Sequence, residues 1–213
     1  MKFAAAIVAL AGVAGFANAD VLANWTFESS VPTTAGPFAA EAGLNAAGSF
    51  ASGFHASTAA VYSNPVGNGS TESFSSNNWG VGDYYQFTTS TVGYNSILFG
   101  WSQTASSTGP QTFDVEWSTN GTVFNTLVND YVVGTTTWSS GTLNPLSVFA
   151  PVALPAAAEN LPTVWVRLTN QVTPGGTGGT NRVDNITIEG TLVPAPGSLA
   201  LLGLAGLVAR RRR

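Results

Sequence analysis

Cysteine is absent from this 213-residue sequence, and histidine occurs once, as His55. The first absence excludes disulfides, thiolate metal sites and cysteine nucleophiles. The second excludes the His-Glu-x-x-His zinc motif, which needs two histidines. No Gly-x-Ser-x-Gly sequence is present either, so the nucleophile elbow of α/β-hydrolases is missing. The familiar combinations of catalytic residues are therefore scarce.

Charged residues make up only 8% of the chain. Between the termini two arginines stand against all eleven acidic residues, which gives the body a net charge of −9. This argues against a nucleic-acid partner, because phosphate contacts need clustered lysine and arginine. A divalent cation or a neutral polar polymer remains compatible with the charge. The other basic residues are terminal, namely Lys2, Arg210, Arg211, Arg212 and Arg213.

The first 19 residues have the layout of a secretory signal peptide. Lys2 supplies the positive start, residues 3–16 are apolar, and Ala17 and Ala19 form a small-x-small cleavage pattern. We expect the Sec machinery to export the chain and signal peptidase to cut before Asp20. The alternative is a transmembrane helix, which is disfavoured because the stretch is short and rich in alanine and glycine.

The C-terminus carries a second targeting segment. Residues 199–209 are apolar or glycine, and four arginines follow them. A bilayer span takes about 20 residues, so this run is short for one. The arginines would stay on the cytoplasmic side of the inner membrane. An exported chain would then stop with its tail in that membrane.

This order of Pro-x-Pro, apolar helix and arginine cluster resembles the PEP-CTERM sorting signal of Gram-negative bacteria. The matching residues lie in 193–213, with Ala195 in place of the family's central glutamate. The resemblance implies processing by an exosortase and delivery to the cell surface or extracellular matrix. A plain tail anchor is the alternative. The motif residues are Val193, Pro194, Ala195, Pro196 and the four terminal arginines.

The body, residues 20–191, reads as one domain that is an antiparallel two-sheet β-sandwich of the jelly-roll type. Short alternating runs rich in aromatic, valine, isoleucine and threonine residues recur between glycine, asparagine, serine and proline. Only residues 38–47 suggest one or two helical turns. The expected strands are residues 23–28, 59–63, 84–89, 96–102, 111–118, 124–132, 135–142, 146–149, 163–169 and 183–189.

Alternation within these strands predicts which side chains face the core. Phe113, Val115 and Trp117 share one face, and Asp114 and Glu116 share the other. Later in the chain, alternate apolar residues face inward, namely Ile97, Phe99 and Trp101 in one strand and Val164, Val166 and Leu168 in another. Trp165 and Arg167 are then expected on the outer surface.

The first and last strands resemble those of carbohydrate-binding-module jelly rolls, broadly the galactose-binding-like sandwiches. The matching residues are Phe27-Glu28 near the start and Asp184-Asn185-Ile186 near the end. In that family the acids hold a structural calcium ion, so the resemblance implies Glu28 and Asp184 as ligands. Oxygen ligands suit a hard cation such as Ca²⁺. The alternative is that Asp184 caps a bulge and Glu28 is solvated.

Aromatic side chains are the candidates for a sugar platform, because flat rings stack on the C–H faces of sugars. Trp79 lies in a loop-like sequence and Trp165 alternates outward, so these two are the main candidates. A sandwich core absorbs several large aromatic residues, and this is the competing explanation. Further candidates are Tyr84, Tyr85 and Trp138, with Asn77, Asn78, Asp83 and Gln86 as hydrogen-bonding partners.

Three functions remain compatible with the sequence. The favoured one is a non-enzymatic exported protein of the cell surface or extracellular matrix. The second is a glycan-binding module of that layer, with an extracellular polysaccharide as partner. The third is a polysaccharide hydrolase that uses Asp114 and Glu116, and it is disfavoured because two acids on an outward strand face are usually just solvated.

Overall fold

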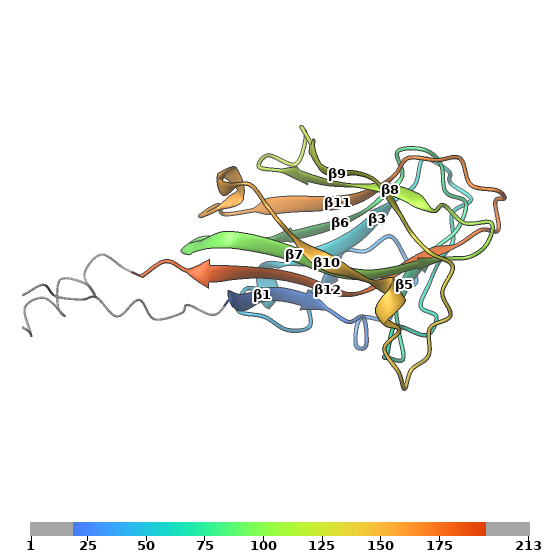
Figure 1. Cartoon of the computed structure of the whole chain (residues 1–213), viewed down its shortest axis with the longest axis horizontal. Coiled ribbons are helices and arrows are strands. Elements are labelled where there is room, and N and C mark those ends of the chain that lie inside the picture. Colours follow the sequence, from blue (N-terminus) through green and yellow to red (C-terminus); the bar gives the residue numbers. More distant parts are fainter. Residues whose placement is uncertain (1–18, 195–213) are drawn as a thin grey trace, which may run out of the picture.

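A computed structural model of the chain describes residues 19–194. They form an all-β sandwich of two antiparallel sheets, as the alternating pattern predicts (Figure 1). The signal helix and the C-terminal apolar helix expected from the sequence fall outside the described residues. Within residues 19–194, no helix is long and apolar enough to cross a membrane.

Sheet A is built around the two longest strands, β7 (Tyr94–Ala105) and β12 (Asn181–Leu192). Its strand order is β10-β7-β12-β5-β4, and β1 also pairs with β12. The last strand among residues 19–194 is therefore central to this sheet. The other members are β1 (Ala19–Trp25), β4 (Tyr62–Ser63), β5 (Phe74–Ser76) and β10 (Val148–Ala153).

Sheet B has the strand order β2-β3-β6-β11-β8-β9. Its strands are β2 (Phe38–Ala39), β3 (Phe50–Phe54), β6 (Tyr84–Thr89), β8 (Thr112–Ser118), β9 (Asn125–Val132) and β11 (Val164–Asn170). Three 3-10 turns complete the described elements, namely η1 (Ala46–Gly48), η2 (Pro145–Ser147) and η3 (Ala156–Ala158).

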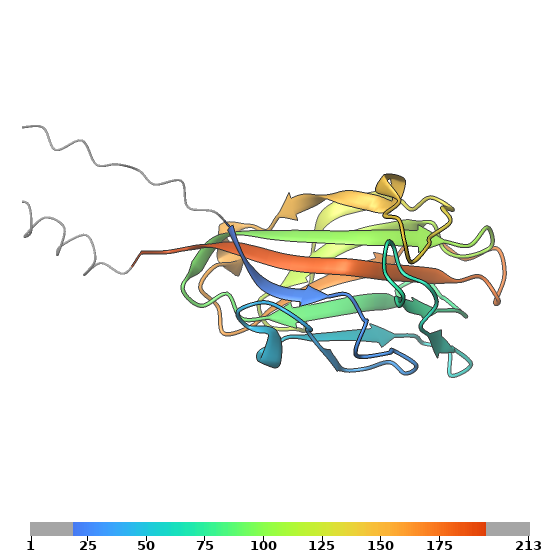
Figure 2. The same cartoon turned by 90° about the horizontal axis from the view of Figure 1, so that it is seen from below.

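The first and last strands lie side by side at one end of the sandwich (Figure 2). Ala19 pairs with Thr191, and Asp20 pairs with Gly190. Cleavage before Asp20 would therefore leave that residue as the start of β1. Both strands also enter or leave the domain at the same end, because they are antiparallel and in register there.

The core between the sheets is rich in aromatic side chains. Trp25, Tyr85, Phe87 and Phe99 are all fully buried. The rings of Trp25 and Phe87 lie 5.5 Å apart between centroids, at a tilted angle that aromatic pairs favour. The inward faces predicted for residues 97–101, 113–117 and 164–168 are confirmed by their burial. A core of this kind stabilises the domain without disulfides.

One predicted strand, residues 135–142, is wrong. Only an isolated bridge between Ser139 and Thr142 occurs there. Hydrogen bonds to side chains replace the backbone pairing of a strand in this segment. Thr104 Oγ1 accepts from the Thr136 backbone N–H at 2.9 Å, and Trp138 Nε1 donates to Ser147 Oγ at 2.8 Å. Serine and threonine hydroxyls compete with strand pairing in this way, so a threonine-rich run does not guarantee a strand.

Three strands, β2, β3 and β5, were missed because they are short and their sequences do not alternate large and polar residues. β3 (FASGF) contains Gly53, at which a Cβ atom would lie 2.7 Å from the Tyr62 ring. The glycine is thus required by packing, although it weakens the sequence signature. The helical turns expected over residues 38–47 are only partly present, because that stretch begins as β2 and ends in η1.

Candidate functional site

The outer face of sheet B, which we call the sheet B face, is the candidate binding surface. It collects the alternate side chains of β3, β6, β11 and β8 that point away from the core. The strand register aligns them in three rows across the sheet. The rows are Phe54–Tyr84–Thr169–Asp114, Ser52–Gln86–Arg167–Glu116 and Phe50–Thr88–Trp165–Ser118.

A stack of four side chains runs across this face. The rings of Phe54 and Tyr84 are nearly parallel, with centroids 5.1 Å apart. The Arg167 Cζ lies 3.7 Å from the Tyr84 ring centroid and 3.6 Å from that of Phe124, so the guanidinium is held between two rings. Cation–π contacts of this kind are attractive. The stack therefore joins β3, β6, β11 and the turn after β8 into one rigid surface.

Neutral partners fix the guanidinium of Arg167 within the stack. Its Nε donates to Gln86 Oε1 at 2.9 Å, and one terminal nitrogen donates to the Tyr84 hydroxyl at 3.0 Å. Partial burial lowers the pKa of Arg167, while Tyr84 and Glu116 act in the opposite direction. Arginine stays protonated in proteins, so a positive charge is fixed on the sheet B face.

Trp165 lies on the sheet B face and is half-buried, as the alternation predicts. A Cβ atom at Gly121 would lie 2.9 Å from its indole, so the β8–β9 turn packs directly on that ring. Part of the indole is thereby covered. Trp165 contributes the remainder of its surface to the face, beside the 41% exposed Phe50.

The structure corrects the expected exposure of three other aromatic candidates. Trp79 is only 6% exposed, Trp138 only 3%, and Tyr85 is fully buried. The loop-like sequence around Trp79 is misleading, because its indole turns inward and donates from Nε1 to the Ser76 carbonyl at 2.9 Å. Trp79 and Tyr85 belong to the core, Trp138 is buried beside Ser147 and Arg182, and none of the three offers a surface to a sugar.

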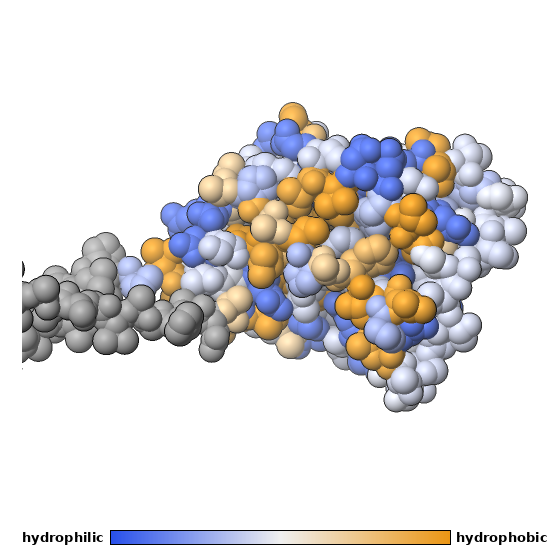
Figure 3. Space-filling view, in the orientation of Figure 1, coloured by the Kyte–Doolittle hydropathy of each residue, from blue (hydrophilic) through white to orange (hydrophobic). Residues whose placement is uncertain are grey.

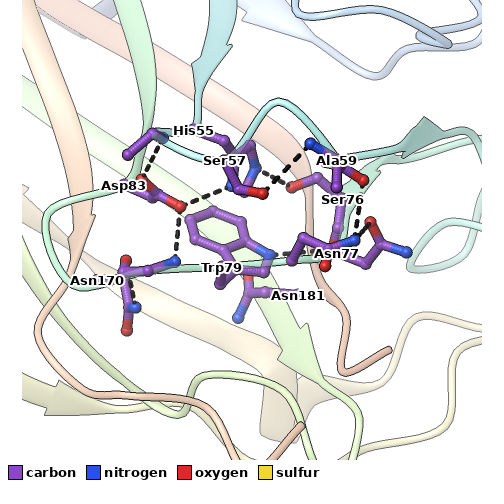
Figure 4. A network of polar contacts seen from close by, with 12 residues as sticks. His55, Ser57, Ala59, Ser76, Asn77, Trp79, Asp83, Asn170 and Asn181 are labelled. Atoms are coloured by element: carbon purple, nitrogen blue, oxygen red, sulfur yellow. Dashed lines mark hydrogen bonds and ion pairs between the residues drawn. The ribbon is translucent and has the colours of Figure 1, made fainter. Parts of the chain in front are cut away.

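Trp79 lies in a buried polar network that contains the single histidine (Figure 4). His55 Nδ1 lies 2.8 Å from Asp83 Oδ2, and His55 Nε2 lies 2.9 Å from Ser76 Oγ. This is the Asp–His–Ser order of hydrolases. However, Ser76 is fully buried and Asp83 is 1% exposed, so no substrate reaches the hydroxyl. The network is structural.

Burial lowers the pKa of His55 below its ordinary value of 6.5, although hydrogen bonding and the charge of Asp83 act in the opposite direction. The unfolded chain therefore takes up this proton more readily than the folded protein. The stability that neutral His55 contributes is present above pH 6.5 and is lost as the pH falls below it.

The two acids considered for catalysis are engaged in structural hydrogen bonds. Asp114 is 7% exposed, and its Oδ1 accepts from the Asp130 backbone N–H at 2.7 Å. Glu116 Oε2 accepts from the Thr169 hydroxyl at 2.6 Å. Asp114 is thus less exposed than the alternation suggests, because β9 bulges over it. Neither acid lines the two hollows described below.

Glu28 and Asp184 both hold the loop of residues 68–72. Glu28 accepts from the Glu72 backbone N–H at 2.7 Å and from the Thr71 hydroxyl. Asp184 is fully buried and accepts from the Asn68 backbone N–H at 2.7 Å and from Ser70 Oγ at 2.6 Å. Burial raises the pKa of Asp184 to about 6. The hydrogen bonds act to lower this pKa, and the negative charge of Glu28 acts to raise it.

A third acid, Glu41, was missed by the sequence analysis. Its carboxylate accepts from the backbone N–H groups of Thr26, Glu28, Ser29 and Ser30. Partial burial acts to raise its pKa, but hydrogen bonds from the Thr26 and Ser29 hydroxyls and from the backbone N–H groups of Ser29 and Ser30 outweigh it and lower the pKa to about 2. Within residues 19–194, no three histidine or acidic side chains come together to hold a metal ion.

Two hollows lie away from the sheet B face. One, of about 330 Å³, is on sheet A between Gly100, Phe149, Pro151 and Thr187. Apolar residues gather near it over β10 and η2, where Leu146 is 83% exposed (Figure 3). The other, of about 350 Å³, is lined by residues from Gly93 to Asn95, by Glu159 and Asn160, and by Val193 and Pro194.

No protein-family model and no curated protein matches the sequence. Among solved structures, the chain is similar to the K2 cleaved adhesin domain of Lys-gingipain from Porphyromonas gingivalis, with 14% identity, coverage of 78% of this chain and 96% of that chain, and a TM-score of 0.45. It is also similar to the CBM22-1 xylan-binding domain of Paenibacillus barcinonensis Xyn10C, with 13% identity, coverages of 83% and 97%, and a TM-score of 0.41.

A third similar structure is the N-terminal cellulose-binding domain of β-1,4-glucanase C from Cellulomonas fimi. The identity is 11%, the coverages are 68% and 90%, and the TM-score is 0.36. Likeness at this level does not define a ligand. The chain's own geometry defines a two-sheet β-sandwich with one rigid aromatic and polar outer face.

Proposed function

We propose that this chain is a non-enzymatic, exported protein of the cell surface or extracellular matrix, and that its sandwich binds a polysaccharide on the sheet B face. From the sequence alone, glycan binding is the second-ranked function, after a non-enzymatic role at the cell surface or in the matrix. The observation that now favours it is the stack of Phe54, Tyr84, Arg167 and Phe124, which sets aromatic and polar groups side by side on an open surface.

The chemistry of the sheet B face suits a sugar. Phe54 is 46% exposed and Phe50 is 41% exposed. Ser52 lies between them on β3, and Gln86 and Thr88 lie beside them on β6. Ring carbons contact the apolar C–H surface of a sugar, while amide and hydroxyl groups bond to its hydroxyls. The face extends across four paired strands, which favours an extended polymer over a single sugar.

Replacing Tyr84 by alanine is expected to weaken polysaccharide binding at least about tenfold, equivalent to about 1.4 kcal/mol. The change removes the middle of the stack and releases both Phe54 and Arg167. The measurement is affinity electrophoresis of the folded domain in gels that contain soluble polysaccharides. Leu146→Ala is the matched control, because it removes an exposed apolar side chain from η2, the turn that precedes β10 of the other sheet. Equal retardation of the Tyr84→Ala variant and the wild type would count against this site.

The export route rests on the two terminal segments. Residues 1–19 would be removed by signal peptidase after Sec export, and residues 192–213 would serve as a PEP-CTERM-like signal at the inner membrane for an exosortase. The pairing of Ala19 with Thr191 supports this proposal, because both segments would join the sandwich at the same end. The destination would be the envelope or matrix of a Gram-negative-type bacterium.

The intact mass of the protein from cells and medium of its native host tests this route. We expect the mass to lack residues 1–19 and the tail beyond about Val193. A protein found only in membranes and retaining Arg210 to Arg213 would instead be tail-anchored, and the exosortase proposal would then fail. The two results differ by the whole apolar tail, so mass spectrometry separates them readily.

We further propose a structural calcium ion at Glu28 and Asp184. The donors suit the cation, because all are oxygens and Asp184 is buried with no cationic side chain paired to it among residues 19–194. Both carboxylates already contact one loop, so a bound ion would tie the first strand, this loop and the last strand together. The ion would supply only structure, by compensating the buried negative charge.

A further inference from the structure

Arg167 is one of only two basic side chains in residues 20–194 apart from the histidine. The other, Arg182, is committed to the fold: its Nη1 donates to the Val66 carbonyl at 3.0 Å, and its guanidinium lies 5.3 Å from the Trp138 ring centroid. Arg167 instead lies on the sheet B face, on a domain with eleven acidic residues. A positive charge at this position needs an explanation.

The surrounding strands offer Arg167 an obvious partner that it does not use. Glu116 stands directly opposite it on β8, and opposite charges at such positions normally attract. Yet the only ion pair within 4.0 Å among residues 19–194 is that of His55 with Asp83. Glu116 is turned toward the Thr169 hydroxyl. The guanidinium is therefore positioned without a direct ion pair, although the charge of Glu116 acts on it from a distance.

Part of the hydrogen-bonding capacity of Arg167 also remains free. A guanidinium has five N–H donors. Two of them bond to Gln86 and Tyr84, and the other three have no partner among residues 19–194. The rings of Tyr84 and Phe124 hold the plane of the guanidinium on both sides. A planar fork fixed in this way is preorganised to pair with a carboxylate through two parallel hydrogen bonds.

We propose that the polysaccharide bound by the sheet B face contains uronic acid, and that Arg167 recognises its carboxylate. This inference rests on the proposed glycan binding and specifies its ligand. Gln86 and Tyr84 are positioning residues in it, because they orient the guanidinium. Glu116 opposes the ligand, since its charge lies beside the place that the carboxylate would take.

The net negative charge of the domain means that an acidic polymer can be attracted only by a local contact at Arg167, and not by the protein surface as a whole. With a net charge of −9, the body repels an acidic polymer at long range. Added salt screens that repulsion, whereas it would weaken a purely electrostatic attraction. Binding is therefore expected to be unchanged or stronger at higher ionic strength, which distinguishes a built site from nonspecific adsorption.

The test uses matched pairs of polymers that differ only in the acid. Polygalacturonate and alginate are each compared with their carboxyl-reduced forms, in which the uronates have become neutral sugars. We expect the wild-type chain to bind at least one acidic polymer about tenfold more tightly than its reduced form. Arg167→Gln is expected to abolish this preference, and Glu116→Gln is expected to increase it. Thermal unfolding of each variant verifies the fold.

The outcomes separate this inference from the function on which it rests. Equal binding of acidic and reduced polymers overturns the role of Arg167 but leaves glycan binding in place. Equal binding of a sulfated polymer with a neutral backbone also overturns it, because charge alone would then suffice. Binding of no polymer at all contradicts both proposals. If Arg167→Gln does not fold, the wild-type preference and the Glu116→Gln increase decide the question.

Discussion

Replacing Asp83 by alanine is expected to lower the free energy of unfolding by about 3–5 kcal/mol. Asp83 accepts from the Gly80 backbone N–H at 2.6 Å and the Ala56 backbone N–H at 2.8 Å, and it contacts His55 Nδ1 at 2.8 Å. All three donors would lose their partner. Because the site is buried, water cannot replace the carboxylate without opening the loops on either side.

Urea unfolding of the wild type and the variant measures this loss. Glu189→Ala is the control, because it removes an acid from β12 that makes no side-chain hydrogen bond among residues 19–194, and we expect a change within about 0.5 kcal/mol. A similar small effect at Asp83 would mean that the network does not stabilise the fold. The burial argument against catalysis by Ser76 would then also lose its support, since the site would open readily.

The β-sandwich could be predicted because its strands are marked by a pattern within their own sequences. In β8 and β11, every second residue is large and apolar, and the structure buries those that the pattern selects, such as Val115 and Val166. The strands that escaped prediction depend on distant partners instead. Gly53 in β3 is needed because Tyr62 packs against it, and nothing in the sequence of β3 reveals that contact.

The candidate site was only partly predictable for the same reason. Alternation places Arg167 and Trp165 outward, and both do lie on the outer face. It could not show that Phe124, from a turn, would come to lie over the guanidinium, because this contact depends on how the turn folds back. Trp79 illustrates the opposite failure, since the burial of its indole depends on His55, which follows β3, and on Phe113 of β8.

Glu41 shows a limit of another kind. Its carboxylate organises the loop that follows β1, yet its sequence neighbours are alanine and glycine and carry no recognisable motif. Glu28 was singled out because a family resemblance drew attention to it. Both acids are needed to describe this end of the sandwich, because Glu41 also accepts from the backbone N–H of Glu28.

Millimolar calcium is expected to raise the melting temperature of the domain by about 5–10 °C. At 100 times its dissociation constant, a ligand that binds only the folded state stabilises it by about 2.7 kcal/mol. For a domain of this size each kcal/mol corresponds to about 2–4 °C. The physical source of this gain is the buried carboxylate of Asp184, since burial without a cation raises its pKa to about 6 and so opposes its charged form.

Differential scanning calorimetry with calcium or with a chelator measures the shift. Glu28→Gln is expected to remove most of it, and this exposed residue can be changed without emptying a buried site. Glu189→Gln is the matched control and should keep the full shift. Magnesium should substitute poorly, because it demands a tighter octahedral shell than two carboxylates and a flexible loop provide. An unchanged melting temperature in calcium would leave the hydrogen bonds to residues 68–72 as the whole role of Glu28 and Asp184, and the sandwich would then depend on its aromatic core alone.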